Sequence, residues 1–196
     1  MSDLPPSNFH ENLHGMLTLE FDSEIPAFLS AVTPALETKP AIHSFMLSLA
    51  KGVHDRGQKA SLLVRGLGNG GLLEIAGLQT DPLRPMSVSL ANPDTAKSLA
   101  QELQSHIPSL SGVIGPLPTV EAFAETWSKH RNCGTKLITN LRLFLLESVT
   151  PPRAPSGSWR EANSNDENLI VQWFIEFGIV RLRTLSILNS AGDLWA

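Results

Sequence analysis

The chain has few of the residues that would mark a secreted or membrane-spanning protein. It holds one cysteine, Cys133, so no disulfide can form within the chain, and a reducing compartment is expected. No run of about 18 apolar residues occurs, and the N-terminus lacks a basic stretch followed by an apolar one. We therefore expect a soluble, cytoplasmic protein.

Charged residues are also scarce, and the basic ones are scattered. Lys and Arg total 15 against 19 Asp and Glu, which gives a net charge of −4. Binding to nucleic acid or to an anionic membrane needs a clustered positive face, so neither is expected as the main partner. Since 42% of the 196 residues are hydrophobic, the composition predicts a packed globular core.

Residues 1–20 are expected to form a loose terminus, because their first part is polar and contains Pro5-Pro6. This part includes His10-Glu11-Asn12-Leu13-His14, which matches the H-E-x-x-H pattern of zinc proteases. That pattern works when a helix places the two imidazoles one turn apart. Gly15 follows directly and no amphipathic helix surrounds the pair, so chance explains the match better and no metal site is predicted.

Two amphipathic helices are expected next. The first begins after Ser23, and its apolar face consists of Ile25, Phe28, Leu29 and Val32. The second begins at Thr38 and Pro40, ends near Gly57, and has an apolar face made of Ile42, Phe45, Met46, Leu49 and Val53. His43 and His54 fall outside this face, and we interpret them as polar-face residues rather than catalytic groups.

The period then changes from helical to extended. Residues 60–67 and 72–80 predict a hairpin joined by Gly68-Asn69-Gly70-Gly71, because Asn-Gly tolerates positive φ. A third strand is expected over residues 86–90. Asn92-Pro93-Asp94 then start a helix, with a cap, a proline and an acid in the first turn. The apolar face of that helix is Ala96, Leu99, Ala100 and Leu103.

The stretch from Gly112 to Val149 is the one around which the rest is expected to pack. Gly112 to Pro116 predict a very short buried strand, and a helix follows that Gly134 can end. Its apolar stripe is Val120, Phe123, Ala124 and Trp127. Residues 135–149 are predicted to form a long strand that needs cover on both faces. Its apolar residues are Leu137, Ile138, Leu141, Leu143, Phe144, Leu145, Leu146 and Val149.

These elements predict an α/β fold, a mixed α+β sheet with helices on both faces. The expected domain spans residues 21–149, and a proline-rich connector follows over 150–157. Residues 158–162 are then expected to form a new strand. Ser164 and Glu167 are spaced as in a capping box before an apolar helix. Residues 158–196 therefore predict the beginning of a second, incomplete module.

Several of these patterns together resemble a known family. They are GVIGP with EAFAETW behind it, LRLFLLESVTPPRAPSG, and WREANSNDENLIVQWFIEF, which lie within residues 21–177. The chain resembles the predicted-acetyltransferase branch of the GNAT superfamily, whose members carry an N-terminal GNAT-like half ahead of a catalytic GNAT half. The resemblance implies a GNAT-like fold, the transfer of an acetyl group to a small-molecule or peptide amine, and acetyl-CoA as co-substrate.

In GNAT folds the pyrophosphate of the coenzyme is held by backbone N–H groups of a Gly-rich loop at a helix N-terminus. Arg65 to Gly70 match the R-x-x-G-x-G string but are expected to form the hairpin instead. The resemblance implies that the loop follows the 86–90 strand, which makes Ala91, Asn92 and Thr95 the candidate cofactor-binding residues. Pro93 lacks an N–H, and Asp94 would repel a pyrophosphate.

In the family the second half supplies the working loop, and that half is expected to be truncated here. Residues 178–188 alternate like a strand rather than continuing the family pattern, and an apolar tail of this kind predicts self-association. Glu74 and Glu147, both expected on strands, are the candidate general bases. An N-acetyltransferase is thus one hypothesis, and a non-catalytic, GNAT-shaped interaction or regulatory module is the other.

Overall fold

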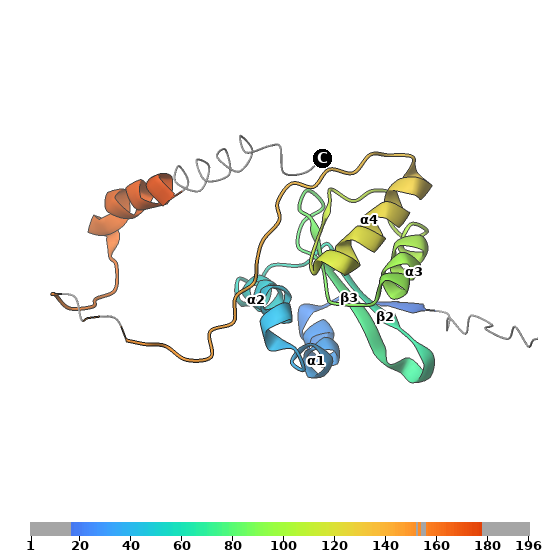
Figure 1. Ribbon diagram of the computed structural model, residues 1–196, viewed down its shortest axis with the longest axis horizontal. Helices are drawn as coiled ribbons and strands as arrows, with labels where there is room; N and C mark the ends of the chain where they lie inside the picture. Colours follow the sequence, from blue (N-terminus) through green and yellow to red (C-terminus); the bar gives the residue numbers. More distant parts are fainter. Residues whose placement is uncertain (1–16, 152, 154–155, 178–196) are drawn as a thin grey trace, which may run out of the picture. The chain divides into compact units, whose positions relative to one another are not determined.

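The computed structural model describes residues 17–151, 153 and 156–177. The chain divides into two units, one ending at Leu146 and one beginning at Glu147. The first is built on a five-stranded sheet of order β1-β2-β3-β4-β5 (Figure 1). The pairs β1–β2, β2–β3 and β3–β4 are antiparallel, whereas β4 and β5 are parallel. The strands are β1 (Thr18–Phe21), β2 (Leu62–Leu67), β3 (Leu73–Gln79), β4 (Met86–Val88) and β5 (Val113–Ile114).

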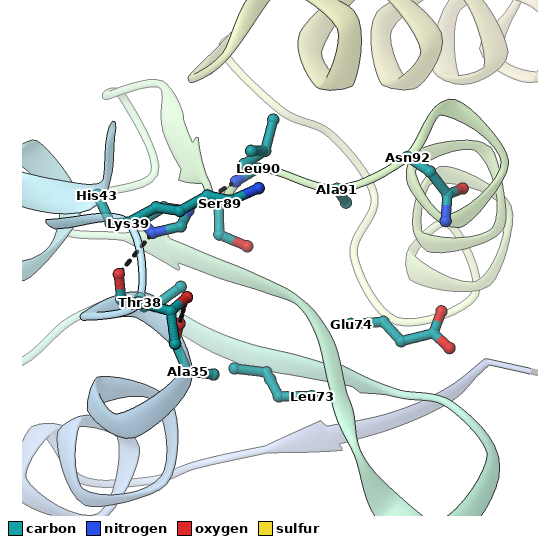
Figure 2. A pocket seen from close by; sticks show the side chains of 11 residues that line it. Ala35, Thr38, Lys39, His43, Leu73, Glu74, Ser89, Leu90, Ala91 and Asn92 are labelled. Carbon is teal, nitrogen blue, oxygen red and sulfur yellow. Dashed lines mark hydrogen bonds between the residues drawn. The ribbon is translucent and has the colours of Figure 1, made fainter. Parts of the chain in front are cut away.

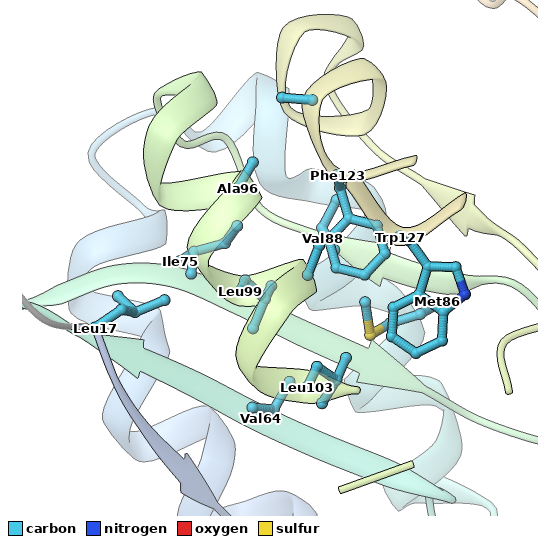
Figure 3. Close-up of a cluster of buried hydrophobic side chains, with 12 residues drawn as sticks. Leu17, Val64, Ile75, Met86, Val88, Ala96, Leu99, Leu103, Phe123 and Trp127 are labelled. Atoms are coloured by element: carbon cyan, nitrogen blue, oxygen red, sulfur yellow. The ribbon is translucent and has the colours of Figure 1, made fainter. Parts of the chain in front are cut away.

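Two helices cover each face of this sheet, as the sequence predicts (Figure 1). On one face, α1 (Ile25–Leu36) and α2 (Pro40–Asp55) enclose a core centred on Phe28. On the other face, α3 (Pro93–Leu103) and α4 (Leu117–Arg131) enclose a second core. Figure 3 shows how Leu99, Phe123 and Trp127 of these two helices lie against Ile75, Met86 and Val88 of the sheet. The α/β mixed sheet is therefore confirmed.

The predicted hairpin is also confirmed, with a short 3-10 turn, η1 (Asn69–Gly71), between β2 and β3. Gly70 and Gly71 have φ of 74° and 75°, a conformation that glycine enters at little cost. Arg65 lies opposite Glu20 in the β1–β2 register and donates two hydrogen bonds to Asp22, at 2.7 and 3.0 Å. The hydrogen bonds to Asp22 raise the pKa of Arg65. The Arg65 side chain therefore links β2 to β1 and the residue after it, and it is not available to a phosphate.

Helices α3 and α4 are joined near their C-terminal ends by one side chain. Arg131 donates hydrogen bonds to the carbonyl oxygens of Gln104 and Ile107, at 2.8 and 2.7 Å. Its guanidinium also lies 5.3 Å from the ring centroid of Trp127, within the range of a cation–π contact. The Arg131 guanidinium thus binds two carbonyl oxygens that follow α3 and accept no hydrogen bond within that helix.

Several predicted boundaries were wrong. Residues 18–20 belong to β1, which the sequence analysis had placed in a loose terminus. Glu24, not Ser23, precedes α1, and Asn132 in the left-handed conformation ends α4 before Gly134 is reached. The apolar face of α2 is rotated by comparison with the prediction: Ile42 and Phe45 are exposed. The residues of α2 that are buried are His43, Met46, Leu47, Ala50 and Val53.

The long strand predicted over residues 135–149 is not formed. These residues have no regular secondary structure, and their large apolar side chains are exposed. An apolar run indicates that burial is needed, but an extended segment becomes a strand only when a sheet edge pairs with it. Among the residues that the structure describes, no strand pairs with this segment.

The second unit begins at Glu147. Residues 158–162 do not form the predicted strand. A capping box does occur, but Asn163 and Asp166 form it at η2 (Ser164–Asp166) instead of Ser164 and Glu167. A helix runs over the described residues 167–177. Hydrogen bonds from the Arg160 guanidinium, and one from the backbone of Asn163, hold the pKa of Asp166 well below its usual range. The apolar tail after Phe177 lies outside the described residues.

Gly115 gives a test of the β4–β5 pair. A Cβ added there would lie 2.6 Å from the Val88 carbonyl oxygen and 2.8 Å from Val88 Cγ2, closer than real contacts allow. We expect Gly115→Ala to lower the free energy of unfolding by about 1–3 kcal/mol, because β5 must shift away from β4.

Gly112→Ala is the matched control, since its added Cβ would meet only Pro85, at 3.7 Å. Urea denaturation of both variants checks the prediction. Equal stability of the two variants would contradict the close approach of β5 to β4.

Candidate functional site

A cavity of about 460 Å³ lies where β4 ends and α3 begins. It is bounded by the start of α2, by the start of β3 and by the loop between β4 and α3 (Figure 2). The side chains that give it chemical character are Lys39, His43, Glu74, Ser89 and Asn92. The sequence candidates Glu74, Ala91 and Asn92 therefore meet at one site, although they are far apart in the chain.

Glu74 is linked to the start of α3 through Thr95. The Thr95 hydroxyl donates a hydrogen bond of 3.0 Å to Glu74 Oε2. The Thr95 backbone N–H donates at 2.8 Å to Asn92 Oδ1, so Asn92 caps the helix as its sequence context predicts. Thr95 is thus bonded to both Asn92 and Glu74, and its hydroxyl holds one oxygen of the Glu74 carboxylate in place at the cavity.

His43 lines the cavity, and the prediction that it lies on the polar face of its helix is wrong. It is only 5% exposed, and its two ring nitrogens both have backbone partners. Nε2 accepts from the Leu90 N–H at 3.2 Å, so Nδ1 carries the proton and donates to the Leu36 carbonyl oxygen at 2.8 Å. The imidazole therefore fixes the end of β4 to the α1–α2 connection. The prediction of a polar-face residue fails because the helical pattern does not show that backbone groups lie opposite a histidine.

Thr119 is a second residue that the sequence analysis missed. Its side chain is fully buried at the N-terminal end of α4. The Thr119 hydroxyl accepts from the Ala91 N–H at 3.0 Å and donates to the Ala91 carbonyl oxygen at 3.0 Å. Both polar groups of the Ala91 backbone are therefore occupied within the protein. A threonine three positions after a Pro116 helix start carries no sequence signal for this role.

Three backbone N–H groups of the β4–α3 loop and of the start of α3 are consequently taken up inside the protein. The Leu90 N–H binds His43, the Ala91 N–H binds Thr119 and the Thr95 N–H binds Asn92, while Pro93 has no N–H. A pyrophosphate needs several backbone amides aimed at it. The residues of this loop therefore do not fit the pyrophosphate of acetyl-CoA.

What the cavity offers instead is a carboxylate positioned at its wall. Lys39 adds a flexible ammonium group at the edge of α2, and Leu73 and Leu90 add apolar surface. A carboxylate held on one oxygen can accept a hydrogen bond from an ammonium or amine on the other. The Glu74 carboxylate therefore suits a small ligand with an amino group.

The remaining sequence candidates lie elsewhere. Glu147 is exposed and belongs to the second unit, outside the residues that line the cavity. His10 to His14 lie outside the described residues. Within the described part of the chain, no group of three or more His, Cys, Asp and Glu side chains could hold a metal ion. No helix of that part has the length and apolar character needed to cross a membrane.

Comparisons of the chain with protein-family models, with curated proteins and with solved structures returned no match.

We expect His43→Ala to destabilise the first unit by about 2–4 kcal/mol, because it leaves the Leu90 N–H and the Leu36 carbonyl without their side-chain partner. His54→Ala is the matched control: His54 lies near the end of the same helix but is exposed, so a change within about 0.5 kcal/mol is expected. Urea denaturation of both variants measures the difference. A His43→Ala variant as stable as His54→Ala would show that the two hydrogen bonds contribute little.

Proposed function

We propose that the chain is an N-acetyltransferase-class protein of the GNAT superfamily whose first unit is a GNAT-shaped half that binds the amine acceptor and not the coenzyme. The order of its elements supports this proposal. Three antiparallel strands lead into β4, α3, β5 and α4, and the only parallel strand pair among the described residues joins β4 to β5. One of the sequence patterns that resemble the family, GVIGP with EAFAETW behind it, covers β5 and much of α4.

The observation that carries the acceptor assignment is the cavity at the end of β4. There Glu74 is held by Thr95, next to the position at which the family resemblance implies the coenzyme loop. A primary amine carries a proton at neutral pH, so the Glu74 carboxylate attracts it and can accept its hydrogen bond. Glu74 would thereby bind and orient the acceptor. Acetyl-CoA, the proposed co-substrate, is assigned to the half of the family fold that begins in the second unit.

A second candidate is an interaction or regulatory module with no part in acetyl transfer. One observation favours it: where the coenzyme should be held, three backbone N–H groups are bonded to His43, Thr119 and Asn92. A loop closed in this way adds stability to the fold and offers little to a ligand. The two candidates differ in whether the cavity binds an amine.

Calorimetric titration of the full chain with spermidine, a small polyamine, tests the acceptor assignment. We expect saturable binding that Glu74→Gln weakens by about 10-fold or more, because a charge-assisted hydrogen bond contributes roughly 1.5–3 kcal/mol. Glu121→Gln, which removes an exposed carboxylate of α4 away from the cavity, is the matched control and should bind as the unaltered chain does. Absence of binding, or equal loss in both variants, would favour the interaction module.

A parallel titration with acetyl-CoA tests the coenzyme assignment. We expect no rise in the melting temperature of the first unit up to about 1 mM, because a ligand stabilises a fold only by binding it. Saturable stabilisation at micromolar acetyl-CoA would show that the first unit does bind the coenzyme. That result would overturn the division of roles between the two halves.

A further inference from the structure

Residues 137–146, here named the apolar segment, expose more hydrophobic surface than a soluble domain usually leaves in water. Seven of these ten residues are large and apolar, and each of the seven is between 62% and 84% exposed. They are Leu137, Ile138, Leu141, Leu143, Phe144, Leu145 and Leu146. A contiguous exposed stretch of this kind marks an interaction site.

The segment has the pattern of a strand that is buried on both faces. With a period of two, Leu137, Leu141, Leu143 and Leu145 share one face, and Ile138, Phe144 and Leu146 share the other. A strand with both faces apolar is typically found inside a sheet covered by helices. The segment is therefore suited to join the edge of a sheet that already has helices on both sides.

The sheet of the first unit has such an edge at β5. Among the described residues, β5 is the last strand and pairs with β4 alone. The Gly112 carbonyl oxygen accepts from the Met86 N–H at 2.9 Å, so it points toward β4. Because successive residues of a strand point their polar backbone groups to opposite sides, those of Val113 point away from β4. An added strand would pair with these outward groups.

We propose that the apolar segment of one copy pairs with the β5 edge of a second copy, so that two chains exchange strands and form a dimer. Every copy carries both the segment and the edge, so two copies can exchange segments reciprocally and close with two-fold symmetry. Within residues 17–146, the described part of its own unit, the segment pairs with no strand. Its connection to α4 is only five residues long, residues 132–136, and a short connection favours exchange over folding back.

The surface involved is large enough for a stable dimer. Full burial of one large aliphatic side chain removes roughly 60–120 Å² from water, on the usual relation between transfer free energy and area. Seven such side chains in each of two copies bury on the order of 800–1,700 Å², which reaches the range of specific protein interfaces. The segment carries one charged residue, Arg142, so little charge needs to lose its water.

Light scattering during size-exclusion chromatography of the full chain, from about 1 to 100 µM, tests the proposal through the concentration dependence of the mass. We expect the mass to double as concentration rises. The double variant Leu143→Asp with Leu145→Asp places two charges on one face of the segment and should remain monomeric. Leu83→Asp is the matched control, because Leu83 is equally exposed, at 86%, but lies outside the segment. It should dimerise as the unaltered chain does.

A second variant tests the β5 edge. It is needed because the two aspartates in the segment could prevent dimer formation even if the segment did not pair as a strand. Val113→Pro removes the outward N–H of β5 and should also abolish the dimer, whereas urea denaturation should show that the unit still folds. Hydrogen exchange should show the amides of residues 137–146 protected only at concentrations where the dimer forms. A monomer at every concentration would overturn the proposal, whether its segment is exposed or is protected against its own β5. A dimer that survives both variants would also overturn it.

Discussion

The pairing of β4 with β5 is the constraint on which the first unit depends. β4 is the strand at which an antiparallel meander turns into a parallel pair, and α3 provides the crossover between its two members. The absence of a side chain at Gly115 lets β5 lie against Val88. Once β5 is fixed, α4 follows directly and must pack beside α3, so one close backbone approach determines where both helices of that face lie.

The cavity at the end of β4 lies between the start of β3 and the connection from α1 to α2. Beyond the end of β4, side chains must satisfy the backbone groups that no longer have a strand partner. His43 and Thr119 do so from opposite faces of the sheet. They occupy two backbone N–H groups of the loop that an anion would need, while the Glu74 carboxylate remains at the wall of the cavity. The functional proposal for the first unit depends on this contrast between bonded backbone N–H groups and an accessible carboxylate.

Most elements of the fold could be predicted from the sequence, because their signals are local. Asn92-Pro93-Asp94 specify the start of α3 within three residues, and the Gly70-Gly71 turn specifies the hairpin. Even Glu74 and Asn92 were found as candidates, since the family resemblance and strand position point to them. The β1 strand was missed because it is short, it lies close to a polar terminus, and its pairing partner is more than forty residues away.

Contacts between distant groups could not be predicted in this way. The burial of His43 depends on the Leu90 N–H, which lies 47 positions further along the chain. Thr119 acts on Ala91 across 28 positions, and neither residue has a neighbouring motif. Residues 135–149 show the opposite failure: their composition correctly indicates a need for burial, yet composition does not say which edge supplies the partner strand.

Helices α3 and α4 are fastened to each other at both ends. Thr119 joins the first turn of α4 to the residue before the α3 cap, and Arg131 joins the last turn of α4 to the carbonyl groups that follow α3. With two such fastenings, neither helix can slide or splay relative to the other. Any motion that widens the cavity would therefore move both helices together, with hinges between β4 and α3 and in the segments on either side of β5.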